Sequence, residues 1–301
     1  MTGRIVVGLD GSPQSFAAAR WAAREALHRG RPLLLLHSWL SQPLNVPIAQ
    51  EAGNKRRYGR EVLEAARTEL SEQFPALSMS LELTAELAGK ALVGHAKSAS
   101  LVVIGSHGRG ALAGALLGST GLHVLGTAEC PVVMVRAGHD RASGAGTGPS
   151  EIVVGIGTCA DDGATGSLLE FAFTAAEASG APVRAVRVCT LPEHVRYRVV
   201  PGRQDDNAGV RTHEHERLVG HERRLLAVLL APWQEKFPAV AATAQVATGT
   251  AGHVLLSAAS RARLLVVGRR MQRSPLAWKL GPVAHAALHH ANCPVAVVPH
   301  T

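Results

Sequence analysis

The stretch Ile5-Val6-Val7-Gly8-Leu9-Asp10-Gly11-Ser12 decides the fold, because it is a short apolar run that ends in turn-forming and helix-capping residues. Its first four residues return as Ile152-Val153-Val154-Gly155, at an offset of 147. Two further stretches return at an offset of 163, namely Leu101–Gly105 as Leu264–Gly268 and Cys130–Val133 as Cys293–Ala296. Self-similarity at so long a period predicts two copies of one domain.

The two offsets also predict where the copies differ and where they join. Their difference of 16 residues indicates an insertion in the second copy, between Thr190 and His221, where turn formers such as Pro201-Gly202 gather. Residues 139–149 have the composition of a flexible linker. We therefore expect a first copy over residues 1–138 and a second copy over residues 150–301.

Composition excludes several classes of protein. In a chain of 301 residues, 47% apolar and 18% charged residues exclude a disordered polymer. No apolar run approaches the ~20 residues that span a bilayer, and Met1-Thr2-Gly3-Arg4 leads into a short apolar run rather than a signal sequence. Four cysteines without CxxC spacing fit a reducing compartment. We expect a cytoplasmic protein with no membrane partner.

The net charge of +8 is spread evenly along the chain. Residues 1–138 carry 14 basic and 10 acidic groups, and residues 139–301 carry 17 and 13, which gives +4 in each part. A nucleic-acid-binding protein would concentrate this charge in a stripe and supply aromatic stacking residues, which make up only 4% of this chain. We therefore expect no nucleic-acid partner.

Within one copy, short apolar runs alternate with longer stretches of helical period, a pattern typical of a parallel sheet covered on both faces. Ser12 and Pro13 predict the start of a first helix, and a second helix is expected from Asn54 to Phe74. The fold class is therefore α/β, with two tandem Rossmann-like, flavodoxin-sized domains, each a five-stranded parallel sheet with helices on both faces. Such sheets bind ligands at the carboxyl ends of their strands. The strands expected in the first copy are Arg4–Gly8, Leu33–His37, Ser80–Ala85, Leu101–Gly105 and Val132–Arg136.

A glycine-rich stretch follows the fourth expected strand, with the pattern Gly105, two residues, Gly108, nine residues, Gly118-Ser119. Gly105 and Gly108 would let the backbone approach an anion without a Cβ in the way. Gly118 and Ser119 open a helix whose free amides and dipole favour a phosphate, and the Ser119 hydroxyl can donate to the same oxygens. Glycines that merely mark turns are the alternative, but their place between a buried strand and a new helix favours an anion site.

Three stretches together resemble the universal stress protein family: the Gly105–Thr120 pattern, the opening Val6–Ser12 and the closing Cys130–Val133. The resemblance extends over both copies. It implies an adenine-nucleotide-binding fold whose tandem copies pair through their last strands. It also implies ATP as the ligand, and Mg²⁺, if it accompanies the nucleotide, would be held mainly by phosphates and water.

Carried over residue by residue, the resemblance assigns roles to positions of the first copy. Asp10 accepts from the adenine or ribose edge, Gly8 and Leu9 line that pocket, and Ser38 supplies backbone contacts to the base. Ile104 and Arg109 complete the candidate contacts. Ribose and phosphates would be held by Gly105, Gly108, Gly118, Ser119 and Thr120.

The position of Asp10 indicates a ligand role independently of the resemblance, because a carboxylate directly after a buried strand lies at the edge of the sheet where ligands bind. Its alternative role is to cap the following helix, although Ser12 already suits that position.

The second copy departs from the pattern at each informative position. Gly157 stands in the place of Asp10, Met271 in that of Gly108, and Gly281-Pro282 in that of Gly118-Ser119. These changes remove an acceptor, add a side chain and remove an amide donor, so we expect a degenerate nucleotide site. The basic residues around the altered loop are expected to be solvated rather than to hold an anion: Arg269, Arg270, Arg273 and Lys279.

The sequence gives weaker support for other kinds of site. Gly155-Ile156-Gly157 fits a loose dinucleotide fingerprint, but the expected second strand Val186–Thr190 has no acidic residue, and no P-loop motif occurs. His213 and His215 lie two apart, so a helix would not bring them to one face, and no metal is expected. Cys130 and Cys293 precede expected buried strands, which favours core packing over redox chemistry.

Three hypotheses for the function stay open at this point. The leading one is an ATP-binding protein with a regulatory role in stress, whose second copy is a structural or regulatory partner. The second is an enzyme that slowly hydrolyses ATP or transfers its phosphate, with His107 as the only candidate acid or base in the loop. The third is a nucleotide-free dimerisation scaffold. Whether whole chains form a homodimer is not decided by the sequence.

Overall fold

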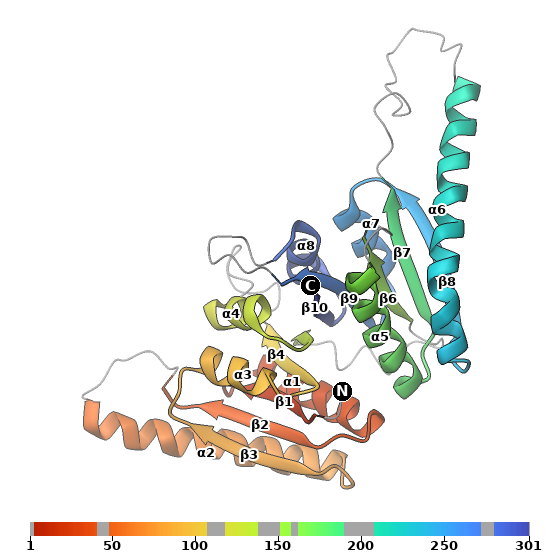
Figure 1. The fold of residues 1–301 in the computed structure, drawn as a ribbon. Helices are drawn as coiled ribbons and strands as arrows, with labels where there is room; N and C mark the ends of the chain where they lie inside the picture. Colours follow the sequence, from red (N-terminus) through yellow and green to blue (C-terminus); the bar gives the residue numbers. More distant parts are fainter. Residues whose placement is uncertain are drawn as a thin grey trace.

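In the part of the chain that the structure describes, ten strands form one continuous sheet, in the order β3-β2-β1-β4-β5-β10-β9-β6-β7-β8 (Figure 1). This computed structural model describes residues 3–40, 48–106, 118–137, 151–157, 162–189, 208–271 and 280–300. In the first copy the strands are β1 (Ile5–Leu9), β2 (Leu33–Ser38), β3 (Met79–Thr84), β4 (Leu101–Ser106) and β5 (Val132–Arg136). In the second copy they are β6 (Ile152–Ile156), β7 (Val183–Cys189), β8 (Ala242–Thr248), β9 (Leu264–Arg270) and β10 (Val295–His300).

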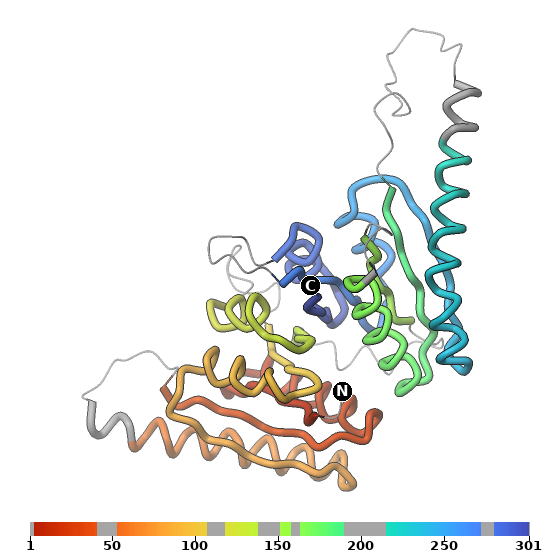
Figure 2. Tube along the Cα trace, viewed as in Figure 1, coloured from red at the N-terminus to blue at the C-terminus, as the bar shows by residue number. Residues whose placement is uncertain are grey.

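The helices are divided between the two faces of this sheet. One core joins α1 (Pro13–His28), α2 (Ile48–Gln73), α5 (Asp162–Ser179) and α6 (Ala208–Lys236). The opposite core joins α3 (Ala88–Ala96), α4 (Ser119–Thr127), α7 (Ala251–Ala258), the short 3-10 helix η2 (Ala259–Arg261) and α8 (Pro282–His290). Figure 2 shows the long helices α2 and α6 along the two outer ends of the sheet.

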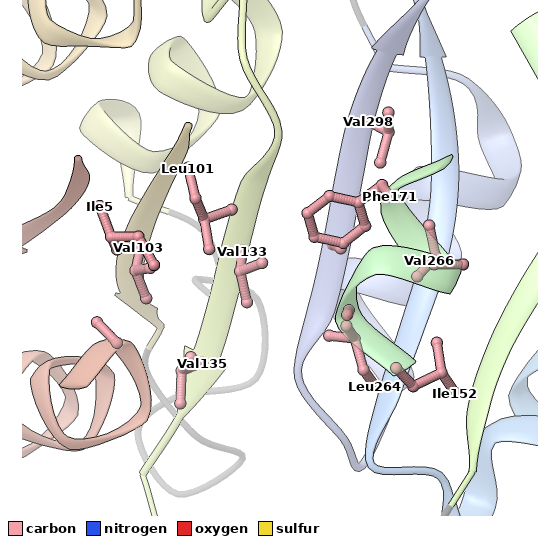
Figure 3. Packing of buried hydrophobic residues seen from close by; sticks show 14 of the residues in the cluster. Ile5, Leu101, Val103, Val133, Val135, Ile152, Phe171, Leu264, Val266 and Val298 are labelled. Carbon is pink, nitrogen blue, oxygen red and sulfur yellow. The ribbon is translucent and has the colours of Figure 1, made fainter. Parts of the chain in front are cut away.

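Strand alternation explains this division. Ile5, Val7 and Leu9 face the first core and Val6 faces the second, since successive side chains of a strand point to opposite faces. Because both faces are covered, both sets are apolar. Figure 3 shows such apolar side chains on strands of both copies, among them Val133 and Val266.

Within each copy every strand pair is parallel, and the same strand order is used twice. The sheet continues from one copy to the other through an antiparallel pair, in which Ala296 of β10 lies opposite Val133 of β5. The expected fold class, two tandem Rossmann-like α/β domains, is confirmed.

The local predictions hold to within a residue or two at most boundaries. β5 has the predicted bounds, and Ser12 is the N-cap of α1, where its hydroxyl accepts from the Ser15 amide at 3.2 Å. The second helix begins at Ile48 instead of Asn54, because Gly53, a poor helix former, hides the continuity of its first turns in the sequence. The linker 139–149 and most of the expected insertion, up to residue 207, lie outside the described residues.

Candidate functional site

A pocket of about 240 Å³ opens at the carboxyl ends of β1, β2 and β4. It is closed by the first turns of α1, α3 and α4, as expected for a parallel sheet whose ligands lie beyond the strand ends. Every sequence-predicted site residue that the structure describes lines this pocket: Gly8, Leu9, Asp10, Ser38, Ile104, Gly105, Gly118, Ser119 and Thr120. Gly108, Arg109 and His107 lie outside the described residues.

The turn between β1 and α1 presents Asp10 to the pocket. Gly11 has a φ of +86°, in the left-handed region that favours glycine, so the chain can reverse directly after the strand. The Ser12 amide donates to Oδ1 of Asp10 at 2.9 Å, which fixes the exposed carboxylate at the pocket wall. Since Ser12 itself caps α1, the alternative role of Asp10 as the helix cap is not needed.

Gly118 and the start of α4 form the polar end of the pocket. Gly118 is the N-cap, and its carbonyl accepts the first helical bond from the Leu122 amide at 3.0 Å. The amides of Ser119, Thr120 and Gly121 precede that bond, so the helix itself gives them no acceptor. No acidic residue lies in this first turn to offset the helix dipole. This end of the pocket is suited to an anion.

Gly105 has a packing role in addition to the one expected from the sequence. A Cβ at this position would lie 2.6 Å from the carbonyl carbon of Gln14, in the first turn of α1. Gly105 is therefore required by the close packing of α1 on β4, and its role beside an anion stays a prediction. By contrast, nothing lies within 4 Å of the corresponding position at Gly118.

Other parts of the pocket lining are apolar. They include Leu36, Leu92, Ile104 and Met134, which come from β2, α3, β4 and β5. Sequence reasoning missed the contributions of α3 and β5, because no local motif marks a residue that reaches the pocket from a distant element. The Ser38 hydroxyl donates to the Glu86 carbonyl, so this side chain holds the loop before α3 against β2.

His37 supports the same edge from the other face of the sheet. Its Nδ1 donates to the Leu9 carbonyl at 2.9 Å, which ties the end of β2 to the end of β1. Burial lowers the pKa of His37 below its ordinary value of 6.5, and the hydrogen bond to Leu9 and the charge of Asp10 offset part of this shift. The imidazole is therefore neutral at pH 7.

In the second copy the corresponding pocket has different chemistry. Gly157 provides no carboxylate, and Pro282 occupies the first position of α8 after the N-cap Gly281. The strands also run further than in the first copy, since Met271 donates to the His300 carbonyl at 2.7 Å beyond the end of β9. The chain thus stays paired with β10 one residue past the end of β9.

Arg269 corrects one expectation. We expected the basic residues of this region to be solvated, but Arg269 is buried, and its guanidinium donates to the carbonyls of Gly126 and Ala128 at the end of α4. In the reverse direction, Arg136 of β5 donates to the Leu288 carbonyl of α8 at 2.6 Å. Each copy therefore caps a helix of the other with a charged donor.

Comparison with known proteins agrees with this architecture. The sequence pattern of the Universal stress protein family matches twice, over residues 1–136 and 150–299. The chain belongs to the universal stress protein family. It is a tandem member, with two family domains in one chain.

Relatives of this universal stress protein occur in mycobacteria. One from Mycolicibacterium smegmatis is 32% identical over 301 residues, covering 98% of this chain and 96% of the relative. One from Mycobacterium tuberculosis is 32% identical over 304 residues, covering 97% and 96%. A crystal structure of a universal stress protein from Archaeoglobus fulgidus matches with a TM-score of 0.63, 16% identity and 99% of both chains covered, which shows the shared fold.

Two kinds of site are missing from the described part of the chain. No cluster of three or more histidine, cysteine or acidic side chains there could hold a metal ion. No helix among the described residues is long and apolar enough to cross a bilayer.

Proposed function

We propose that this universal stress protein binds ATP in the pocket of its first copy and has a regulatory role in stress. The observation that carries the proposal is the composition of that pocket. Apolar walls and a carboxylate at Asp10 lie in one cavity with the uncompensated start of α4.

Each part of the pocket would bind one part of the nucleotide. Leu36, Leu92 and Met134 offer apolar surface to the adenine ring, and Asp10 accepts a hydrogen bond from its amino group or from the ribose. The free amides at the start of α4, with the hydroxyls of Ser119 and Thr120, donate to the phosphates. Gly108 and Arg109 stay predicted contacts of this part of the ligand.

Any magnesium ion would arrive with the nucleotide. Among the described residues that line the pocket, Asp10 is the only carboxylate. Mg²⁺ demands six oxygen ligands, so the phosphates and water would supply most of them. Among the same residues Asp10 is also the only candidate general base, and its proposed role at the adenine or ribose favours binding over hydrolysis.

The second copy would act as a structural or regulatory partner. Its pocket has no counterpart of Asp10, and Pro282 contributes no amide at the start of α8. The pair of β5 with β10 places the last strands of the two copies side by side. We propose that this pairing is the family's association of last strands, made within one chain, and that it needs no second chain.

Isothermal calorimetry of the full chain tests the proposal. We expect one ATP per chain; no binding would favour the scaffold hypothesis, and two sites would contradict the degenerate second copy. Asp10→Asn keeps an oxygen for the Ser12 amide but removes the charge, so it should weaken ATP by about tenfold and inorganic triphosphate much less. Glu129→Gln, which removes a carboxylate remote from this pocket, is the matched control. Turnover that falls in His107→Ala would instead support the enzyme.

A further inference from the structure

The pocket of the second copy, at the carboxyl ends of β6, β7 and β9, differs from the proposed nucleotide pocket in a consistent direction. It has a volume of about 400 Å³, compared with about 240 Å³ in the first copy. Val188 has the place of Ser38 in the strand register, and Val283 has the place of Thr120 after the N-cap glycine. Side chains with hydroxyls in the first pocket are thus replaced by valines in the second.

The walls of this pocket are apolar on both faces of the sheet. Ile156 comes from β6, Leu168 from α5 and Leu255 from α7. Val188 and Val283 complete this lining and are only partly buried, so a ligand can reach their methyl groups. A pocket of this volume has the size of a small-molecule site. An apolar ligand of several carbon atoms would therefore gain free energy by leaving water for this pocket.

Arg270 supplies an accessible positive charge to this apolar pocket. It is the last residue of β9, and its exposed side chain lines the pocket. Because successive side chains of a strand point to opposite faces, Arg270 does not share the role of Arg269, which caps α4. No hydrogen bond or ion pair within the described part of the chain holds the Arg270 guanidinium. This guanidinium can therefore donate to a ligand.

The other titratable side chains that line the pocket do not oppose this charge. Arg187 is held by the protein, since its Nη1 donates to the Gly157 carbonyl at 2.8 Å and its Nε is 2.6 Å from Oε2 of Glu222. The ring of His300 packs on Gly268, where an added Cβ would lie 3.0 Å from it. Among the described lining residues none is acidic. The charged group of a ligand in this pocket is therefore an anion.

We propose that the second copy binds an apolar carboxylic acid, such as a medium-chain fatty acid, in this pocket. The carboxylate would accept two parallel N–H bonds from Arg270, and the hydrocarbon chain would lie along Leu168 and Leu255. One guanidinium satisfies a carboxylate in this way. A phosphate would lack donors, because Pro282 brings no amide to the start of α8. The degenerate nucleotide site would thus serve a different class of ligand and give the second copy a regulatory input of its own.

Calorimetry of the full chain with octanoate, in the absence of ATP, tests the proposal independently of the nucleotide site. We expect saturable binding of one octanoate per chain. Octan-1-ol, which lacks the charge, should bind about tenfold more weakly. Acetate, which lacks the hydrocarbon chain, should bind at least about a hundredfold more weakly. If no straight-chain acid from butanoate to decanoate binds, or if octan-1-ol binds as tightly as octanoate, the proposal is overturned.

Matched variants locate the site. Arg270→Gln removes the guanidinium, so it should weaken octanoate by about tenfold and leave octan-1-ol unchanged. Arg261→Gln makes the same change of charge at an exposed position outside this pocket and should leave both probes unchanged. Val283→Thr places a hydroxyl among the apolar walls, so it should weaken both probes by about threefold or more. Octanoate binding that is unchanged in Arg270→Gln, or that falls equally in Arg261→Gln, would overturn the assignment.

Discussion

Single glycines of one sequence pattern have different physical roles in this protein. At Gly105, an added Cβ would meet the backbone of Gln14 at 2.6 Å, whereas at Gly118 it would meet nothing within 4 Å. We therefore expect Gly105→Ala to lower the free energy of unfolding by about 1–3 kcal/mol, because backbone atoms cannot move aside cheaply. Gly118→Ala should lower the free energy of unfolding by clearly less than Gly105→Ala does. Chemical denaturation of the two variants checks this, and a larger loss in Gly118→Ala would contradict it.

His37 predicts a dependence of stability on pH. Burial lowers the pKa of His37 in the folded chain below the ordinary 6.5. As the pH falls through 6.5, the unfolded chain takes up a proton at this position that the folded chain does not, so the free energy of unfolding decreases. Urea denaturation at pH 7.5 and 5.5 measures this change. The free energy of unfolding should decrease less between these two pH values in His37→Gln than in the wild type. Equal decreases would show that His37 does not contribute.

The buried thiols predict selective labelling. Burial raises the pKa of Cys130 and of Cys293 to about 12, so both stay protonated at pH 8. Iodoacetamide should therefore leave these two thiols unmodified in the folded protein, whereas the partly exposed Cys189 reacts. Mass spectrometry of the labelled peptides measures this, with the denatured chain as the control. Rapid labelling of Cys130 or Cys293 in the folded chain would argue against core packing.

Among the secondary-structure elements, α4 links the proposed nucleotide pocket to the second copy. Its first turn lines the pocket, and the carbonyls at its other end accept from Arg269. Arg269→Met would leave those buried carbonyls without their donor, so we expect a loss of about 2–3 kcal/mol in stability. ATP affinity should fall with it, because the helix that presents the phosphate donors loses its anchor.

Arg270→Met is the control for this change. Arg270 is the next residue of the same strand but is exposed, so its substitution should leave stability and ATP affinity unchanged. Thermal denaturation and ATP titration of both variants compare them directly. If both variants behave alike, the link through α4 is not supported.

The sequence predicts elements well where their signals are local. The run Ile5–Gly8 with Ser12 and Pro13 contains a strand, a turn, a cap and the first helical position, and each has its place in the structure. Arg269 could not be placed in this way, because its acceptors lie more than 140 residues earlier in the chain and the local sequence looks like a solvated basic loop. The pocket residues from α3 and β5 could not be predicted for the same reason, because their neighbours in the pocket are distant in the sequence.

The whole molecule is organised as one sheet, with buried residues of both copies in the same core clusters. We therefore expect a single cooperative unfolding transition. Leu226→Ala, a fully buried change in α6 of the second copy, should lower that one transition by about 2–5 kcal/mol for both copies. Differential scanning calorimetry measures the number of unfolding transitions. Hydrogen exchange of the backbone amides in β1 and β6 measures the stability of the first and the second copy separately. A second copy that melts separately would contradict this prediction.

The central claim is that the first copy holds the nucleotide and the second does not. A crystal structure of the full chain grown with ATP tests this most directly. We predict density for one nucleotide, with its phosphates at Ser119 and Thr120 and its base near Asp10. Density in the pocket at Gly157 and Pro282, or in neither copy at saturating ATP, would contradict the account.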